Sequence, residues 1–141
     1  MSGMNDTSGD RIADLRYRGD ASIEQMSTLR HDLVGWSTRA GLAHDQIEAI
    51  ALAGYEALAN AAEHAYPQGG GVIELHASIG GEGLTVTVTD EGRWREPPTD
   101  PGFRGRGLML IRNLCTHTDV AATIAGTTVT MNWELATPAG R

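Results

Sequence analysis

Hydrophobic residues along the chain recur with two spacings, and each spacing predicts a different kind of element. Steps of three and four residues predict a helix that Ser22 caps at its start and Gly41 closes. The apolar stripe of this helix consists of Ile23, Met26, Leu29, Leu33 and Trp36. A second helix is predicted over residues 43–66, with Asp45 near its start and Pro67 beyond its end. The first part of the chain is therefore expected to be mainly helical.

Alternation with a period of two predicts strands in much of the remaining chain. Residues 71–90 contain two β-rich runs around a glycine-rich turn, which is a hairpin signal. Residues 11–18 predict an edge strand, residues 108–115 a third helix, and residues 119–135 two further strands. This order of elements favours an α+β fold. We expect a two-layer α/β sandwich whose mixed, mostly antiparallel sheet carries helices on one face.

Length and composition narrow the class of protein. The 141 residues predict one domain over residues 11–135, between flexible tails at residues 1–10 and 136–141. The single cysteine, Cys115, excludes an internal disulfide framework, and no apolar run approaches the roughly 20 residues of a membrane span. The net charge of −7 argues against an extended nucleic-acid surface. We therefore expect a cytoplasmic protein that contacts neither membranes nor nucleic acid directly.

The second predicted helix carries polar side chains along one ridge. Glu56, Asn60 and His64 are spaced four residues apart, so successive members differ by about 40° around the helix axis. A carboxylate, an amide oxygen and an imidazole in a row suit a divalent cation and a general base. A solvated helix face with a stray Asn is the alternative, and this helix alone does not decide between the two.

Asp90 ends the apolar face of a predicted strand. The period of two places it on the side of Leu84, Val86 and Val88, where an unpaired carboxylate is costly. The exocyclic amine of a ligand could donate a hydrogen bond to it, and an internal Arg or a backbone N–H group is the alternative donor. Gly92, two residues later, gives room for a flat ligand or for a tight turn.

Glycines and arginines precede the third predicted helix. Gly105 and Gly107 alternate with Arg104 and Arg106 directly before Leu108. A helix N-terminus fronted by glycines exposes N–H groups that bind phosphate oxygens. The segment matches neither the Walker A pattern nor the dinucleotide-binding fingerprint. A flexible loop followed by a capped helix is the alternative interpretation.

Taken in order, these three features resemble one family. Glu56, Asn60, Ala61 and His64 satisfy an N box of the form E-x-x-x-N-A-x-x-H. "DEG" resembles a first glycine box, "GRG" a second, and "GTTVTM" a closing strand. The chain thus resembles the GHKL ATPases, the superfamily of gyrase, histidine kinases and MutL. Within it, the chain is most similar to the short anti-sigma-factor serine/threonine kinases of bacteria. The resemblance implies the Bergerat ATPase fold, with ATP and Mg²⁺ as cofactors.

The resemblance also implies a role for each candidate residue. Asn60 would coordinate Mg²⁺, Glu56 would act as general base, and His64 would help to shape the site. Asp90 would accept a hydrogen bond from the adenine amino group, and Thr127 would support it through a water. The remaining cofactor-binding residues would be Gly92, Arg104, Gly105, Arg106, Gly107 and Leu108.

One position departs from the family pattern, and two functions stay open. Trp94 stands where the first glycine box, D-x-G-x-G, has its second glycine. The resemblance implies an ATP-dependent serine/threonine protein kinase and anti-sigma factor. Such a protein would bind a sigma factor, phosphorylate an anti-anti-sigma factor and form a homodimer. The alternative is a nucleotide-poor binding module that sequesters a sigma factor or another regulator without catalysis.

Overall fold

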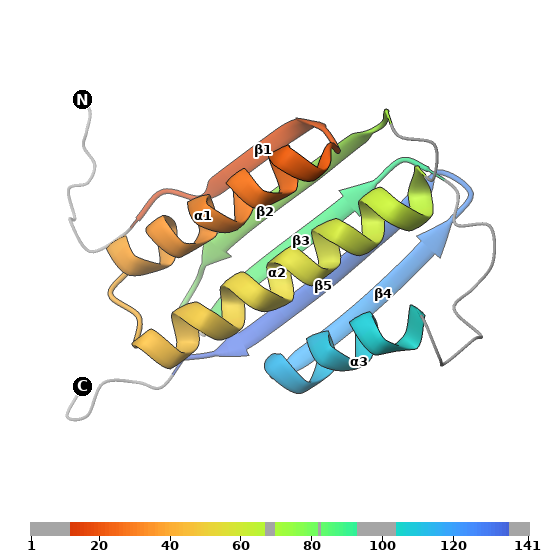
Figure 1. Ribbon diagram of the computed structural model, residues 1–141. Coiled ribbons are helices and arrows are strands. Elements are labelled where there is room, and N and C mark those ends of the chain that lie inside the picture. The colour runs from red at the N-terminus through yellow and green to blue at the C-terminus, as the bar shows by residue number, and fades with distance from the viewer. Residues whose placement is uncertain (1–11, 67–69, 82, 93–103, 136–141) are drawn as a thin grey trace.

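The computed structural model describes residues 12–66, 70–81, 83–92 and 104–135, excluding the side chains of His64 and of residues 104–107. One strand, two helices, two strands, one helix and two strands follow one another along the chain in the predicted order (Figure 1). The elements are β1 (Leu15–Asp20), α1 (Ile23–Arg39), α2 (His44–Ala65), β2 (Val72–Ile79), β3 (Gly83–Asp90), α3 (Arg104–Leu114), β4 (His117–Thr123) and β5 (Gly126–Glu134).

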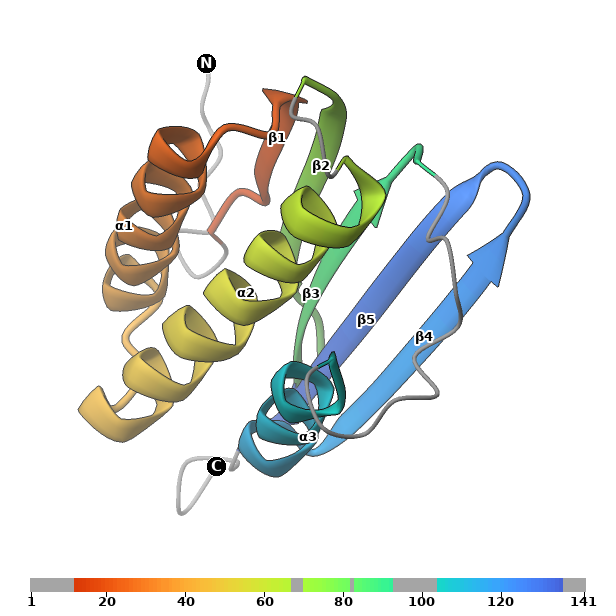
Figure 2. The ribbon, with the colours of Figure 1, turned by 45° about the vertical axis from the view of Figure 1, so that its right-hand side comes forward.

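The described strands form one five-stranded sheet in the order β1-β2-β3-β5-β4. Each of the four pairings between them is antiparallel. Helices α1, α2 and α3 lie on one face of this sheet, with α2 between the other two (Figure 2). The expected α+β sandwich with helices on one face is therefore confirmed.

The ends of the two long helices lie where the sequence predicts them. The Ser22 side chain caps α1 by accepting a hydrogen bond from the Gln25 N–H at 3.1 Å. Gly41 follows this helix with a φ of +83°, a conformation that glycine adopts without steric cost. Helix α2 ends at Ala65, directly before Tyr66 and Pro67. These residues act locally in the sequence, so they mark the ends of both helices independently of tertiary packing.

The core lies between the sheet and the helical layer. Along β3, the alternating side chains Leu84, Val86 and Val88 are at most 1% exposed, because they face the helices. Helix α2 turns small side chains to the interior, and Ala53 and Ala57 are at most 1% exposed. Small residues let a helix approach its neighbours closely. Helix α2 accordingly contacts α1, α3 and β3.

The predicted starts of two elements differ from the structure by four residues. The third helix begins at Arg104 rather than at residue 108. Glycine disfavours helical conformation, so the sequence placed the start after Gly107; tertiary packing of Leu108 and Ile111, both buried, overrides this weak preference. The edge strand spans Leu15–Asp20 rather than residues 11–18, because its pairing with β2 runs from Leu15 opposite Ala77 to Asp20 opposite Val72.

Within the described residues, no helix is both long and apolar enough to cross a membrane.

Candidate functional site

A buried carboxylate lies at the edge where β3 ends. Asp90 is 2% exposed and shares the interior face with Leu84, Val86 and Val88, as the alternation predicts. The Gly92 N–H donates a hydrogen bond to Asp90 Oδ1 at 3.1 Å. Part of the required hydrogen bonding therefore comes from the backbone, which is one of the donors expected from the sequence.

The structure brings Thr127 to Asp90. In the register of β3 with β5, Asp90 stands directly opposite Thr127, which is 3% exposed. Side chains that face each other across an antiparallel pair lie on the same side of the sheet, with Cβ atoms about 5 Å apart. A carboxylate and a hydroxyl from residues far apart in the sequence thus form one buried polar pair.

Two glycines let the backbone close tightly around this pair. A Cβ on Gly126 would overlap the backbone carbonyl oxygen of Asp90, and Gly126 has a φ of +149°. A Cβ on Gly92 would lie 2.5 Å from the carbonyl oxygen of Ala65 in the last turn of α2. The turn after Asp90 therefore packs directly against the end of the helix that carries the predicted N box.

The N-box ridge follows the middle and end of α2. Glu56 and Asn60 are both partly buried, while Glu63 on the same helix is exposed. Their neighbours Ala57 and Ala61 are buried against the core. The ridge therefore lies at the border of the interior, open enough for contact with a ligand. The side chain of His64 lies outside the described residues.

The second glycine box lies in the first turn of α3, which packs against α2. The first four N–H groups of a helix have no partner within it. Within α3 these include the N–H groups of residues 104–106, so Gly105 contributes a main-chain donor of the kind that binds phosphate, and Gly107 follows directly after them. The side chains of Arg104 and Arg106 are outside the described residues, as is Trp94. Leu108 contributes a buried side chain, 8% exposed.

The side chains at this site suit a metal ion that is bound mainly by phosphates and water rather than by the protein. The described residues contain no group of three or more His, Cys, Asp or Glu placed to hold an ion. Mg²⁺ is commonly bound by one or two protein oxygens together with phosphates and water. The amide oxygen of Asn60, partly buried on α2, fits that mode of binding, whereas an all-protein cage has no ligand set here.

The structure adds residues that the sequence did not single out. The Tyr66 hydroxyl accepts a hydrogen bond from the Glu91 N–H at 2.8 Å, next to Asp90. The Arg18 guanidinium lies 2.9 Å from Glu91 Oε2 and 3.3 Å from Glu74 Oε2. The hydrogen bond and charge of Glu91 raise the pKa of Arg18 above its ordinary value, with a smaller contribution from Glu74. In the sequence, Tyr66 was visible only as the end of a helix.

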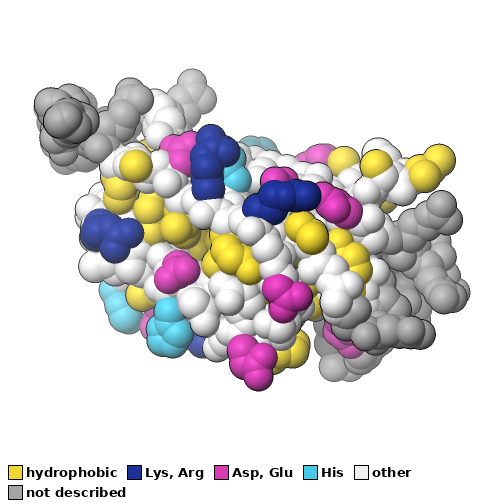
Figure 3. Space-filling view, turned by 90° about the horizontal axis from the view of Figure 1, so that it is seen from above, with side chains coloured by type: hydrophobic (Ala, Val, Ile, Leu, Met, Phe, Trp, Pro, Cys, Tyr) yellow, Lys and Arg dark blue, Asp and Glu magenta, His cyan; other side chains and the backbone are white. Residues whose placement is uncertain are grey.

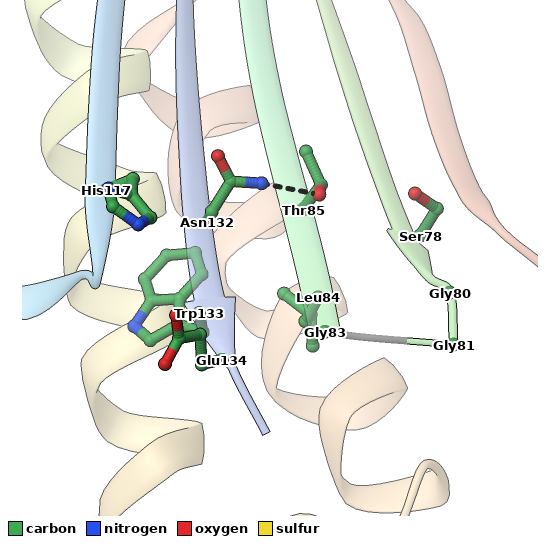
Figure 4. A pocket seen from close by; sticks show the side chains of 10 residues that line it. All are labelled: Ser78, Gly80, Gly81, Gly83, Leu84, Thr85, His117, Asn132, Trp133 and Glu134. Atoms are coloured by element: carbon green, nitrogen blue, oxygen red, sulfur yellow. Dashed lines mark hydrogen bonds between the residues drawn. The ribbon is translucent and has the colours of Figure 1, made fainter. Parts of the chain in front are cut away.

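A hollow of about 650 Å³ lies at the opposite end of β3, near the β2–β3 turn (Figure 4). Three glycines of that turn, Gly80, Gly81 and Gly83, leave space there, and Asn132 donates to the Thr85 hydroxyl at 2.7 Å. None of the predicted site residues lines it. Its size reflects the small residues of a hairpin, and it is a separate feature from the Asp90 edge.

The surface seen in Figure 3 carries basic and acidic side chains interspersed with one another. Among the described residues, Arg16 lies 3.6 Å from Asp14, and Arg18 pairs with Glu74 and Glu91. This face is therefore not a continuous basic surface of the kind that binds nucleic-acid phosphates.

Comparisons with known proteins agree with the fold. A family described as "Histidine kinase-like ATPase domain" matches residues 20–133. The serine-protein kinase RsbW of Staphylococcus aureus, in strains JH9 and Newman among others, is 34% identical over 80 residues. That match covers 55% of this chain and 50% of the relative, so the chain spans about half the length of the curated relatives it matches.

A solved structure extends the likeness over most of the chain. The crystal structure of the RsbU and RsbW domains of Rv1364c from Mycobacterium tuberculosis superimposes with a TM-score of 0.73 at 28% sequence identity. The superposition covers 90% of this chain and 34% of that one. The shared fold therefore extends over most of this chain.

Proposed function

The chain belongs to the family of histidine kinase-like ATPase domains, and from this premise we propose that it is an ATP-dependent serine/threonine protein kinase that acts as an anti-sigma factor. The observation that carries the proposal is the buried pair of Asp90 and Thr127 at the end of β3. A buried carboxylate at a sheet edge suits the amino group of adenine, and the named relative, RsbW, is a serine-protein kinase.

In the proposed mechanism, three parts of the fold bind different parts of the nucleotide. Asp90 accepts a hydrogen bond from the adenine amino group, and Thr127 supports that contact. The main-chain N–H groups of Gly105 and Gly107 bind phosphate oxygens at the start of α3. Asn60 would hold Mg²⁺, which would supply positive charge to neutralise the phosphates. Gly92 lets the turn that follows Asp90 pack against the end of α2, beside the proposed position of the base.

Glu56 is proposed as the general base. It takes the proton from a serine or threonine hydroxyl of a partner, the hydroxyl oxygen bonds to the γ-phosphorus, and ADP leaves. In the anti-sigma-factor kinases that the chain resembles, the partner is an anti-anti-sigma factor. A sigma factor binds another surface, and the active form is a cytoplasmic homodimer built on α1 and β1.

The test compares two acidic residues of the same helix. Purified protein is mixed with Mg-ATP labelled at the γ-phosphate and with candidate anti-anti-sigma factors, and label on the partner is counted. Glu56→Gln is expected to lower the transfer rate by about 10²–10⁴-fold while nucleotide binding is kept. Glu63→Gln, at an exposed position of α2, is the matched control and is expected to transfer at the wild-type rate. If Glu56→Gln transfers phosphate at the wild-type rate, Glu56 is not the general base.

A second candidate function rests on Trp94. A bulky ring in place of the second glycine of the first glycine box favours a module that binds a regulator with little nucleotide. Calorimetry with ATP and Mg²⁺ separates the two candidates. Heat of binding at micromolar to millimolar nucleotide supports the kinase, and its absence supports the binding module.

A further inference from the structure

The Tyr66 hydroxyl lies where three segments of the chain meet. It donates a hydrogen bond to the Val72 carbonyl oxygen at 2.6 Å and accepts one from the Glu91 N–H at 2.8 Å. Val72 is the first residue of β2, Glu91 follows the last residue of β3, and Tyr66 directly follows α2. One hydroxyl thus connects the end of the N-box helix with both strands beside it.

The ring that carries this hydroxyl is itself held in place. A Cβ on Gly71 would overlap the ring of Tyr66, so the ring lies directly against the backbone before β2. Tyr66 is partly buried and packs against the hydrophobic core. The position of the hydroxyl is therefore set by packing, and the hydroxyl can in turn fix the backbone of Glu91.

Glu91 is the link to the proposed adenine contact. It stands between Asp90, whose side chain accepts from the Gly92 N–H, and Gly92, which packs against Ala65. Arg18 holds the outer side of the same turn through the Glu91 carboxylate at 2.9 Å. Glu91 is exposed, so water could satisfy its N–H group without Tyr66. What the hydroxyl adds is a fixed position for the turn that carries Asp90.

We propose that Tyr66 is a positioning residue that sets the Asp90 carboxylate for the exocyclic amine of a purine. This inference rests on the proposed function, because it assigns to Tyr66 the orientation of a base that Asp90 binds. The same hydroxyl joins that base-binding edge to the end of α2. The distance between the adenine-binding and phosphate-binding parts of the site is therefore fixed. Affinity for ATP and selectivity for its 6-amino group both depend on it.

The test removes one hydroxyl and compares two nucleotides. Tyr66→Phe keeps the ring against Gly71, and Tyr17→Phe is the matched control because it removes another hydroxyl that donates to a backbone carbonyl, that of Asp20 at 3.1 Å. ATP affinity is measured by calorimetry, and affinity for inosine triphosphate, which lacks the amine, by competition with ATP. Thermal unfolding is followed for each variant.

We expect Tyr66→Phe to weaken ATP binding by about fivefold and inosine triphosphate binding by less than twofold. In the kinase assay, KM for ATP rises and kcat is kept, and Tyr17→Phe matches the wild type in each nucleotide measurement. Equal weakening of both nucleotides, or lower thermal stability with unchanged selectivity, would show a structural role only and overturn the inference. If the wild type itself binds no ATP, the proposed function fails, and that result is distinct from a failure confined to Tyr66→Phe.

Discussion

At the scale of single residues, the Asp90 edge depends on backbone contacts that only glycine permits. Gly126 faces the carbonyl oxygen of Asp90 so closely that a Cβ would overlap it, and its φ of +149° is rarely adopted by residues with a side chain. Thr127 follows directly and stands opposite Asp90. The buried carboxylate–hydroxyl pair therefore requires glycine at position 126 for both space and conformation.

Gly126→Ala is expected to lower the free energy of unfolding by more than about 1 kcal/mol, because the native conformation is incompatible with a Cβ. Gly81→Ala is the control, since a Cβ there meets nothing within 4 Å. Urea unfolding followed by circular dichroism gives both values. Equal midpoints for the two variants would mean that the close approach to Asp90 is relaxed at no cost.

The sequence predicted the buried residues of this edge better than their partners. Period-two alternation placed Asp90 among buried side chains, and its exposure of 2% confirms this. The role of Tyr66 was not predictable from the pattern, because its two hydrogen-bond partners lie 6 and 25 residues away. Alternation determines which face a side chain occupies, but not which distant backbone group it meets.

At the scale of elements, local signals were sufficient for α1 and α2. Ser22, Gly41 and Pro67 mark helix ends by capping, left-handed backbone and loss of an N–H group, and each acts within its own neighbourhood in the sequence. The start of α3 was predicted four residues late. The glycines of its first turn disfavour helical conformation, and the packing of α3 on α2 stabilises the helix there. Boundaries set by tertiary contact were beyond local signals.

Ser22→Ala tests the strongest of these local signals. The Ser22 side chain satisfies the Gln25 N–H, and loss of this cap is expected to lower the free energy of unfolding by about 1 kcal/mol. Ser27→Ala is a matched control, because Ser27 is exposed within the same helix and alanine is the better helix former. We expect Ser27→Ala to be neutral or slightly more stable in the same urea titration. A Ser22→Ala variant as stable as Ser27→Ala would contradict a stabilising cap.

At the scale of the whole molecule, the strand order creates the site. Strand β5 lies between β3 and β4, so β5 pairs with the strand that ends in Asp90 on the side opposite to β2. Hairpin signals predict which neighbouring segments pair, and they do not predict this insertion. The family resemblance supplied Thr127 as the partner of Asp90 in advance, and the topology explains in physical terms how the two come together.

The packing of α3 against the sheet predicts a dependence of stability on alkaline pH. Cys115 follows α3 and is partly buried; its thiol donates to the Ile111 carbonyl oxygen at 2.9 Å and lies 3.3 Å from the Thr118 hydroxyl. Burial raises the pKa of the Cys115 thiol above its ordinary value, although the hydrogen bond with the Thr118 hydroxyl opposes the rise. The folded state therefore keeps the thiol proton to higher pH than the unfolded state does.

The sign of the effect follows from this difference. The stabilisation is fully present below the unfolded pKa, about 8.5, and is lost as pH rises through the raised folded pKa. Urea unfolding of the wild type and of Cys115→Ala is measured at pH 7 and at steps up to about 10.5, with a reductant present. The difference in unfolding free energy between the two proteins is expected to shrink as pH rises. Burial also raises the pKa of Tyr17, but Tyr17 titrates in both proteins, so its contribution cancels in the difference. A difference that stays constant across this range would show that the Cys115 thiol ionises alike in both states, and that α3 does not shield it from water.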